Sequence, residues 1–554
     1  MQWVADALVA TIAAATDWLA KSWLSIVLLL VILPFARRIA PRFGPLRPAI
    51  VYPLVVVVAL LAAMCQTVAL GEPHPPWYSD DFGNVLTADT FARGRLSNPT
   101  HPLYRYFETL YVLQTPRYAS MYPPGQALLL AGAQRLFGLR AVGLWLASAA
   151  AAVAICWAVA AIVPLQIGCV AGLLCAIHPT MMEWNGYYHV GALAAAAGAL
   201  AIGGALRLST QPRTAATLAM GSGIAVLANT RPYEGFVIAV IACAFAIRKP
   251  RYLAIALAIA VVGLAFTAWY DRAVTGDPLL LPYNEYNARY LSAPNFIWQK
   301  PFPPRSYPTF EMETRYGIFR RYYERSRHLS DFLIGSWVRL KEMLGTALPS
   351  SRRPSWLNTL QPFAAVPLLF AVRRNRQVVA ATILFVAAML QITWWPQTHY
   401  FAPGAVLFAL LYAMGVGRMI DRGYGTFAYA CIAVSFAIAI VSYAAAFLPQ
   451  SREKGPRMAV TEALDARPGG QLVIADATCF DVVFNSAEID AAKIVWAHAA
   501  DDGLEPLLDY YRDREVWRLV CDPPFHLQQQ RPPLASGRSD YERDIYYPYH
   551  FRQR

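Results

Sequence analysis

Residues 51–84 read VYPLVVVVALLAAMCQTVALGEPHPPWYSDDFGN, and this stretch decides the class of fold. Its first part, Val51 to Leu70, is almost entirely apolar. A helix of about 20 apolar residues is long enough to cross the hydrocarbon layer of a bilayer. Two aspartates, Asp80 and Asp81, follow close behind. Ionisable residues at membrane depth are costly and are functional candidates by default. The stretch therefore predicts a membrane-spanning helix with a carboxylate pair just beyond its end, which needs either a functional or a structural explanation.

The whole composition agrees with a membrane protein. Of the 554 residues, 57% are hydrophobic and only 15% are charged, whereas a soluble domain has about 25% charged residues. Apolar runs recur along most of the chain, and the short alternating segments of a β-barrel are absent. The net charge of +13 comes mostly from arginines in short loops, without a basic stripe interleaved with stacking aromatics. We therefore predict an all-α polytopic membrane protein, and no nucleic acid as partner.

Twelve transmembrane segments fit the apolar pattern best. They are 23–36, 50–70, 140–163, 165–179, 189–207, 214–230, 235–248, 252–270, 356–373, 377–395, 401–417 and 425–447. The stretch at 1–23 lacks the basic start of a signal peptide and is interpreted as an interfacial helix that leads into the first segment.

Basic residues distinguish the two membrane sides. The basic set is Arg37, Arg38, Arg42 and Arg47; Arg207 and Arg213; Arg248, Lys249 and Arg251; Arg373, Arg374 and Arg376; and Arg418 and Arg422. These loops alternate with loops of the other set, apart from an uncharged turn near Pro164, and cytoplasmic loops carry such an excess. The outward-facing set is then 71–139, 180–188, 231–234, 271–355, 396–400 and the tail from about 448.

The first outer loop and the tail have recognisable patterns. In YPPGQALLLAGAQRLFG, residues 122–138, the two prolines suit a helix start and Gly138 suits its end. The helix is too short to span, and we expect it to lie along the interface. In the tail, QLVIAD and KIVWAH resemble strands, and LEPLLDYYRDREVWRLVCD combines a helix with a strand. We predict two domains: a transmembrane domain, 1–447, and a small extracytoplasmic α/β domain, 448–554.

Two of the eight cysteines, Cys479 and Cys521, lie in this tail. They could pair if the tail is extracytoplasmic, because oxidising compartments permit disulfides. The sequence gives no distance between them, so a free pair is an equal alternative.

The acidic pair Asp80 and Asp81 has three interpretations. A carboxylate can act as a general base toward an attacking hydroxyl. The pair could instead hold a divalent cation such as Mg²⁺ or Mn²⁺, since hard cations prefer oxygen ligands. The third interpretation is structural: Ser79 or Asp80 caps the following helix, whose positive end favours negative charge.

Other outward polar residues could converge on the same face. They are Tyr122, His189, Arg231, Glu234, Arg289, His399 and Tyr400. Two of them have a structural alternative: Arg231 could pair with Glu234 or extend to the membrane interface, and His399 could belong to an aromatic belt with Trp394 and Trp395.

His101 and Glu108 are expected to be contacts within the fold of the first outer loop.

No GxGxxG or GxxxxGK[ST] motif is present, so a nucleotide donor is not indicated. A base, several cations and adjacent lipid suit the transfer of a group from a lipid phosphate to a hydroxyl.

Several longer stretches resemble the GT-C superfamily of membrane glycosyltransferases. They are SDDFGNVLTADTFARGRLSNPTHPLYRYFE, YPPGQALLL, NTRPYEG, QTHYFAP, VFNSAEIDAAKIVWAH and YYRDREVW. Within this superfamily, the chain resembles bacterial proteins grouped with protein O-mannosyltransferases and the lipid A aminoarabinose transferase.

The resemblance implies a polyprenyl-phosphate sugar donor, transfer with inversion, and Asp80 as the base. Relatives of the mannosyltransferase type often have Asp-Glu where this chain has Asp-Asp, which leaves open whether Asp80 or Asp81 reacts. The implied location is the bacterial inner membrane with a periplasmic active site, and the acceptor is a glycan, lipid or protein. The resemblance does not decide whether a metal is needed. A transporter or flippase of a lipid-linked glycan is the main alternative, and a noncatalytic scaffold is a third hypothesis.

Overall fold

The computed structural model describes residues 23–32, 44–70, 76–351, 355–371, 375–445, 456–499, 503–521 and 526–529. The chain forms two compact units, one from the described parts of 1–99, 111–305 and 316–453, and the other from those of 100–110, 306–315 and 454–554. Several predicted features lie outside the described residues: the interfacial helix up to residue 22, Arg37, Arg38, Arg42, Arg373, Arg374 and the domain boundary at 447/448.

Each of the twelve predicted segments coincides largely with one α-helix of the first unit, with ends that differ by a few residues. These helices are α2 (Trp23–Ile32), α3 (Pro48–Leu70), α6 (Ala141–Val159), α7 (Leu165–Ala176), α9 (Gly191–Thr210), α10 (Thr214–Ala228), α11 (Pro232–Ala246), α12 (Pro250–Thr275), α16 (Gln361–Ala371), α17 (Arg376–Met389), α18 (Ala405–Asp421) and α19 (Gly425–Ala445). Within the described ranges, six helices are long and apolar enough to cross a membrane, or seven if α7 and α8 (Pro179–Asn185), bent by 50°, form one span. The fold is therefore a mostly helical, multi-pass one, and the number of twelve crossings remains a prediction.

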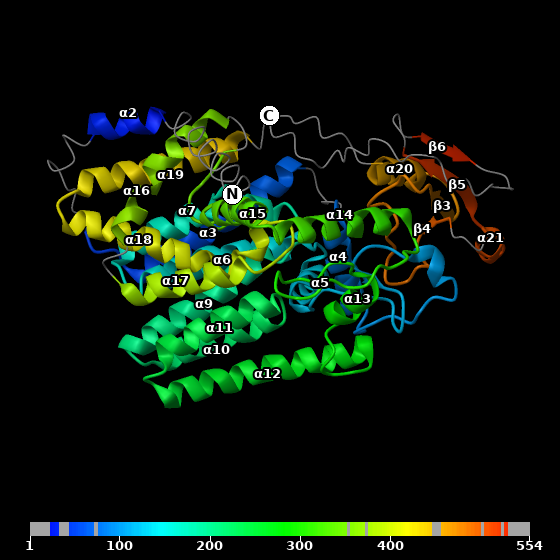
Figure 1. Ribbon diagram of the computed structural model, residues 1–554, viewed down its shortest axis with the longest axis horizontal. Coiled ribbons are helices and arrows are strands. Elements are labelled where there is room, and N and C mark those ends of the chain that lie inside the picture. Colours follow the sequence, from blue (N-terminus) through cyan, green and yellow to red (C-terminus); the bar gives the residue numbers. More distant parts are fainter. Residues whose placement is uncertain are drawn as a thin grey trace. The chain divides into compact units, whose positions relative to one another are not determined.

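Helix α9 is the central helix of this unit. It is rich in alanine and glycine, and 83% of its apolar window is buried. Figure 1 shows α9, α10, α11 and α12 side by side, and α6 also packs on α9. Small residues allow this close packing: a Cβ at Gly198 would lie 2.0 Å from the carbonyl oxygen of Pro403. Helix α12 differs, because only 17% of its window is buried and apolar side chains such as Val262 are exposed, as expected for a lipid-facing helix.

Shorter elements connect these helices. They are α4 (Ser79–Ala92), β1 (Val112–Leu113), β2 (Ala119–Ser120), α5 (Gly125–Phe137), α13 (Pro282–Tyr290), α14 (Phe310–Ser326), α15 (Leu329–Leu344), η3 (Ser355–Leu360), η4 (Thr398–Tyr400) and η5 (Ala402–Gly404). Helices α4 and α5 pack against each other. The predicted end of α5 is confirmed, since Gly138 follows it with a φ of 73°, in the left-handed region that favours glycine.

The second unit contains a four-stranded sheet in the order β4-β3-β5-β6. Its elements are η2 (Tyr104–Phe107), α20 (Pro456–Asp465), β3 (Gln471–Ala475), β4 (Ile494–His498), α21 (Glu505–Tyr510), β5 (Glu515–Val520) and β6 (His526–Gln529). Strand β3 pairs in parallel with β4 and β5, whereas β6 is antiparallel to β5. The strands expected in QLVIAD and KIVWAH are present as β3 and β4. A disulfide joins Cys479 to Cys521, so these two cysteines pair.

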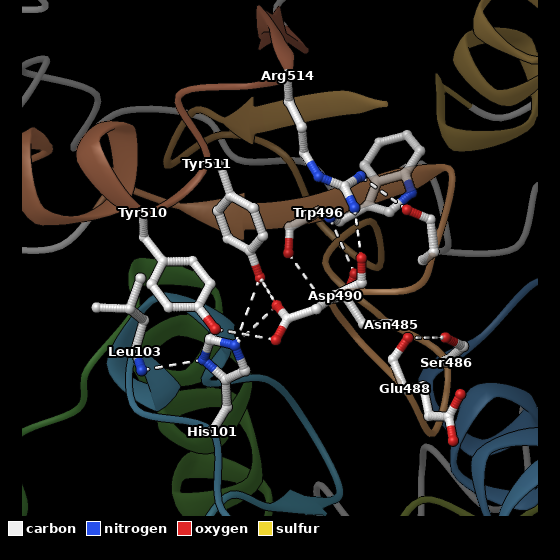
Figure 2. Close-up of polar contacts among 11 residues, drawn as sticks. His101, Leu103, Asn485, Ser486, Glu488, Asp490, Trp496, Tyr510, Tyr511 and Arg514 are labelled. Carbon is white, nitrogen blue, oxygen red and sulfur yellow. Dashed lines mark hydrogen bonds and ion pairs between the residues drawn. The ribbon is translucent and has the colours of Figure 1, made fainter. Parts of the chain in front are cut away.

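Segment 100–110, which lies in the predicted first outer loop, is part of this second unit. The backbone N–H of Leu103 donates to Nδ1 of His101, and Nε2 of His101 lies 3.0 Å from Oδ1 of Asp490 (Figure 2). The hydroxyls of Tyr510 and Tyr511 donate to the same carboxylate, at 3.0 and 2.5 Å. These hydrogen bonds lower the pKa of Asp490, although partial burial opposes them. His101 is therefore a fold contact, as expected from the sequence.

Candidate functional site

A cavity of about 240 Å³ opens in the first unit where several helix ends and loops meet. Its walls come from the start of α4, the start of α5, the turn between α10 and α11, the end of α12, α13, and the stretch around η4. Seven of the nine residues predicted from the sequence line it: Asp80, Tyr122, His189, Arg231, Glu234, His399 and Tyr400. The structure thus brings residues from distant parts of the chain to one place.

Asp80 presents its carboxylate to this cavity and is held by its neighbours. The hydroxyl of Tyr122 donates a hydrogen bond to Oδ1 of Asp80. Burial and the charge of Asp80 raise the pKa of Tyr122 well above its usual value, so this phenol keeps its proton. Gly83, nearly one turn further along α4, makes room for the ring, because a Cβ there would lie 2.9 Å from Cδ2 of Tyr122. Asp80 is consequently an oriented carboxylate in contact with the cavity.

Asp81 has a different environment. Its side chain is 1% exposed and does not line the cavity. Oδ1 accepts from the backbone N–H of Tyr188 at 2.7 Å, and Oδ2 accepts from the backbone N–H of Trp77 at 3.1 Å. Burial raises the pKa of Asp81, while His189 and these two N–H groups oppose the rise. Asp81 therefore joins the start of α4 to the loop after α8, and we interpret it as a structural carboxylate.

The capping hypothesis for the acidic pair is wrong. The N-cap residue of α4 is Tyr78, whose side chain makes no capping hydrogen bond, and Ser79 and Asp80 already lie inside the helix. Both aspartates lie in the first turn, where the positive end of the helix dipole favours their negative charge. This stabilisation is general to the helix end and leaves Asp80 available for chemistry.

Arg231 provides an unpaired cation. Its guanidinium carbon lies 4.8 Å from the ring centroid of Tyr400, a cation–π contact. The described residues offer its guanidinium no hydrogen bond or ion pair, and Nε is buried without a partner. The expected local pair with Glu234 is absent, although Glu234 also lines the cavity. A guanidinium that is held by stacking and has unused donors is well suited to bind an anion.

Two histidines stack at one side of the cavity. The rings of His189 and His399 lie 4.6 Å apart with an angle of 22° between them. Burial lowers the pKa of His399 well below its usual value, and the neighbouring His189 and Arg231 lower it further. His399 is therefore neutral at pH 7. Nε2 of His189 lies 3.6 Å from Oδ1 of Asp81, which links the stacked pair to the buried carboxylate.

Arg289, the ninth predicted residue, lies elsewhere. Its guanidinium donates to Glu285, four residues earlier, and to the carbonyl oxygen and hydroxyl of Thr115, at 2.7 and 2.6 Å. It is not among the residues that line the cavity. Its donors are used to attach α13 to the loop before β2.

Sequence reasoning missed several residues that line the cavity, among them Gln126, Asp271 and Tyr283. For Asp271 a signal existed, because an ionisable residue directly follows the apolar segment 252–270. Gln126 and Tyr283 stand in no distinctive local pattern, and only the folded chain places them here.

The hydrogen bonds of Asp80 and Asp81 show whether this pair has oxygens free to coordinate a divalent cation. Both oxygens of Asp81 accept backbone hydrogen bonds, so only Asp80 of the pair faces the cavity. Within the ranges that the structure covers, no group of three or more His, Cys, Asp or Glu residues could hold a metal ion. The pair does not fit the metal site considered above, and no step is derived through a metal.

Comparisons with known proteins give distant structural similarity. No protein-family model and no curated protein matches the chain. Among solved structures it is similar to the oligosaccharyltransferase AglB from Archaeoglobus fulgidus, in complex with an inhibitory peptide and a dolichol-phosphate (13% identity, TM-score 0.46, 76% of this chain and 62% of that chain). It is also similar to ArnT from Cupriavidus metallidurans bound to undecaprenyl phosphate (12% identity, TM-score 0.39, 84% of this chain and 93% of that chain).

A further structure of the archaeal protein, with Zn and sulfate, gives 14% identity, a TM-score of 0.45 and coverage of 76% of this chain and 60% of that chain. The chain thus spans less than two thirds of the length of the archaeal protein. Both neighbours are membrane glycosyltransferases of the GT-C superfamily, the class named in the sequence analysis.

Proposed function

We propose that this chain is a membrane glycosyltransferase that moves a sugar from a polyprenyl-phosphate donor to a hydroxyl group, with Asp80 as general base. One observation carries the proposal: the carboxylate of Asp80 and the unpaired guanidinium of Arg231 line the same cavity. The reaction needs a base for the attacking hydroxyl and positive charge for the departing phosphate. The cavity offers one group of each kind.

The chemistry follows from these two groups. The acceptor oxygen attacks the anomeric carbon of the sugar, and Asp80 takes the hydroxyl proton. The bond between the anomeric carbon and the phosphate oxygen breaks, and the polyprenyl phosphate leaves with the electron pair. Arg231 stabilises the negative charge on that phosphate. Attack from the side opposite the leaving group inverts the anomeric configuration.

Neighbouring side chains keep these groups in place. Tyr122 donates to Asp80 and fixes the orientation of its carboxylate. The ring of Tyr400 supports the guanidinium of Arg231. Because His399 is neutral, it adds no repulsion toward the cation. A base that is oriented before the substrate arrives needs little reorganisation in the transition state.

The membrane side of the proposed reaction is the extracytoplasmic one. The parts of the chain that line the cavity, at 80–84, 121–126, 189–190, 230–234 and 281–284 among others, lie in or next to the segments that the arginine pattern places outside. The disulfide between Cys479 and Cys521 also suits an oxidising compartment. We propose the periplasmic face of a bacterial inner membrane, and an envelope glycan, lipid or protein as acceptor.

The test uses the purified full-length chain in nanodiscs. We expect undecaprenyl phosphate to bind, and Arg231→Gln to weaken this binding about tenfold or more, since a hydrogen-bonded ion pair is lost. The matched control is Arg272→Gln, which removes an exposed arginine and should change nothing. Asp80→Asn should bind the lipid normally and fail to transfer sugar. Movement of a labelled lipid-linked sugar across vesicles without transfer would instead support the flippase alternative.

A further inference from the structure

Two buried polar groups of the cavity have no role in the chemistry above. Asp271, near the end of α12, is 3% exposed, and Gln126, in the first turn of α5, is 1% exposed. Both line the cavity. Oδ1 of Asp271 and Oε1 of Gln126 are buried and accept no hydrogen bond from any described residue. A buried acceptor without a donor costs about 1–3 kcal/mol, and folded proteins contain few of them.

Packing holds Asp271 in its position. The neighbouring Tyr270 is fully buried, and its ring lies 5.9 Å from that of Phe91 on α4, the helix that carries Asp80. One turn earlier, Thr267 donates to Oδ1 of Asn229 at 3.0 Å. The end of α12 is thus attached to α4 on one side and to the end of α10 on the other.

Gln126 is held in a similar way. The backbone N–H of Gly125 donates to the carbonyl oxygen of Asn229 at 2.7 Å. A Cβ at Gly125 would lie 2.6 Å from that oxygen, so only glycine allows this approach. Gln126 and Asp271 are therefore both anchored through Asn229, two residues before Arg231. The two unused acceptors belong to one rigid part of the wall.

The missing partners define the ligand chemically. Buried acceptors need O–H or N–H donors, whereas the unpaired Nε of Arg231 needs an anionic acceptor. A polyprenyl phosphate satisfies Arg231 but, once ionised, has no donor for Gln126 or Asp271. The hydroxyl groups of a sugar supply such donors. We propose that Gln126 and Asp271 form a hydroxyl-binding subsite that recognises the sugar of the donor, an inference that rests on the proposed function.

The test compares two lipids of equal chain length, undecaprenyl phosphate and undecaprenyl-phosphate hexoses, on the full-length protein in nanodiscs. Asp271→Asn keeps the shape of the side chain and removes its charge, and Gln126→Leu removes the amide at similar volume. Each should weaken binding of a hexose lipid about tenfold, the effect of losing one strong hydrogen bond, and leave bare undecaprenyl phosphate within about twofold. Asp277→Asn, the matched control on an exposed aspartate, should change neither.

The outcomes separate this inference from the proposed function. Equal losses for both lipids, or unchanged hexose binding in both variants, would overturn the subsite. If the variants do not fold, wild-type protein with monodeoxy hexose lipids decides: no loss for any deoxy position would also overturn it. If wild-type protein binds undecaprenyl phosphate no better than neutral undecaprenol, the proposed function itself fails.

Discussion

Asp80→Asn and Asp81→Asn make the same chemical change at adjacent positions, yet the structure predicts opposite consequences. The buried carboxylate of Asp81 accepts two backbone hydrogen bonds, from the N–H of Tyr188 to Oδ1 at 2.7 Å and from the N–H of Trp77 to Oδ2 at 3.1 Å. Asparagine has one oxygen and one NH₂ group, so one of the two N–H groups would face another donor. Among the described residues, only Tyr122 donates a hydrogen bond to the carboxylate of Asp80, and an amide oxygen can accept that bond equally well.

These contacts set the magnitudes. A hydrogen bond to a charged group contributes about 1.5–3 kcal/mol, and an unpaired buried donor costs about 1–3 kcal/mol more. Asp81→Asn should therefore destabilise the protein by about 3 kcal/mol. Asp80→Asn should leave stability nearly unchanged but slow sugar transfer by about 10²–10⁴-fold, the usual contribution of a general base.

The assay combines thermal unfolding in nanodiscs with single-turnover transfer on the same preparations. Asp277→Asn is the control for a change of charge at an exposed site. A stable, inactive Asp81→Asn together with an active Asp80→Asn would reverse the two roles and refute the reasoning.

Three further changes test other parts of the structure. Gly83→Ala should push the ring of Tyr122 away from Asp80, and a loss of transfer larger than the loss of lipid binding would show this; unchanged transfer would contradict it. Burial lowers the pKa of His498 from 6.5 to about 4, so the unfolded chain takes up a proton first and stability should fall as pH drops from 6.5 toward 4; His498→Gln should flatten that slope in unfolding scans. Burial and the nearby Asp481 raise the pKa of Glu311 from 4.5 to about 8, so the stability of the fold should fall as pH rises from 4.5 toward 8. Glu311→Gln should unfold at a higher temperature than wild type at pH 8 and at a similar temperature at pH 4.5. Equal unfolding temperatures of the two proteins at both pH values would refute the raised pKa of Glu311.

Local pattern was sufficient for the helices and strands. Apolar runs long enough for a membrane mark the positions of twelve helices of the first unit, and QLVIAD and KIVWAH form strands because their β-branched residues suit a sheet. Gly138 marks the end of α5, because it adopts the left-handed backbone conformation that few residues other than glycine take up. In each of these cases the cause lies within a few residues of the effect.

The roles of individual side chains depended on distant contacts. Nothing near Asp80 and Asp81 shows that the N–H of Tyr188 would occupy the second aspartate. Arg231 and Arg289 both lie in segments that the sequence predicts to face outward, and both are near a glutamate. Glu285 precedes Arg289 by one helical turn and binds it, whereas Arg231 stands before the first turn of α11 and remains unpaired. Only the spatial arrangement distinguishes an arginine with unused donors beside a cavity from one whose donors are taken by the fold.

The make-up of the second unit has a consequence for how the chain is made. Its segments 100–110 and 306–315 leave the ribosome long before residues 454–529, to which His101 and Glu311 bind. At about 5–20 residues per second, the earliest segment waits on the order of tens of seconds for its partners. During that time a carboxyl group destined for burial, Glu311, remains hydrated. The second unit can therefore be completed only late in synthesis, and a chain that lacks the last hundred residues would leave segments 100–110 and 306–315 without the partners they have here.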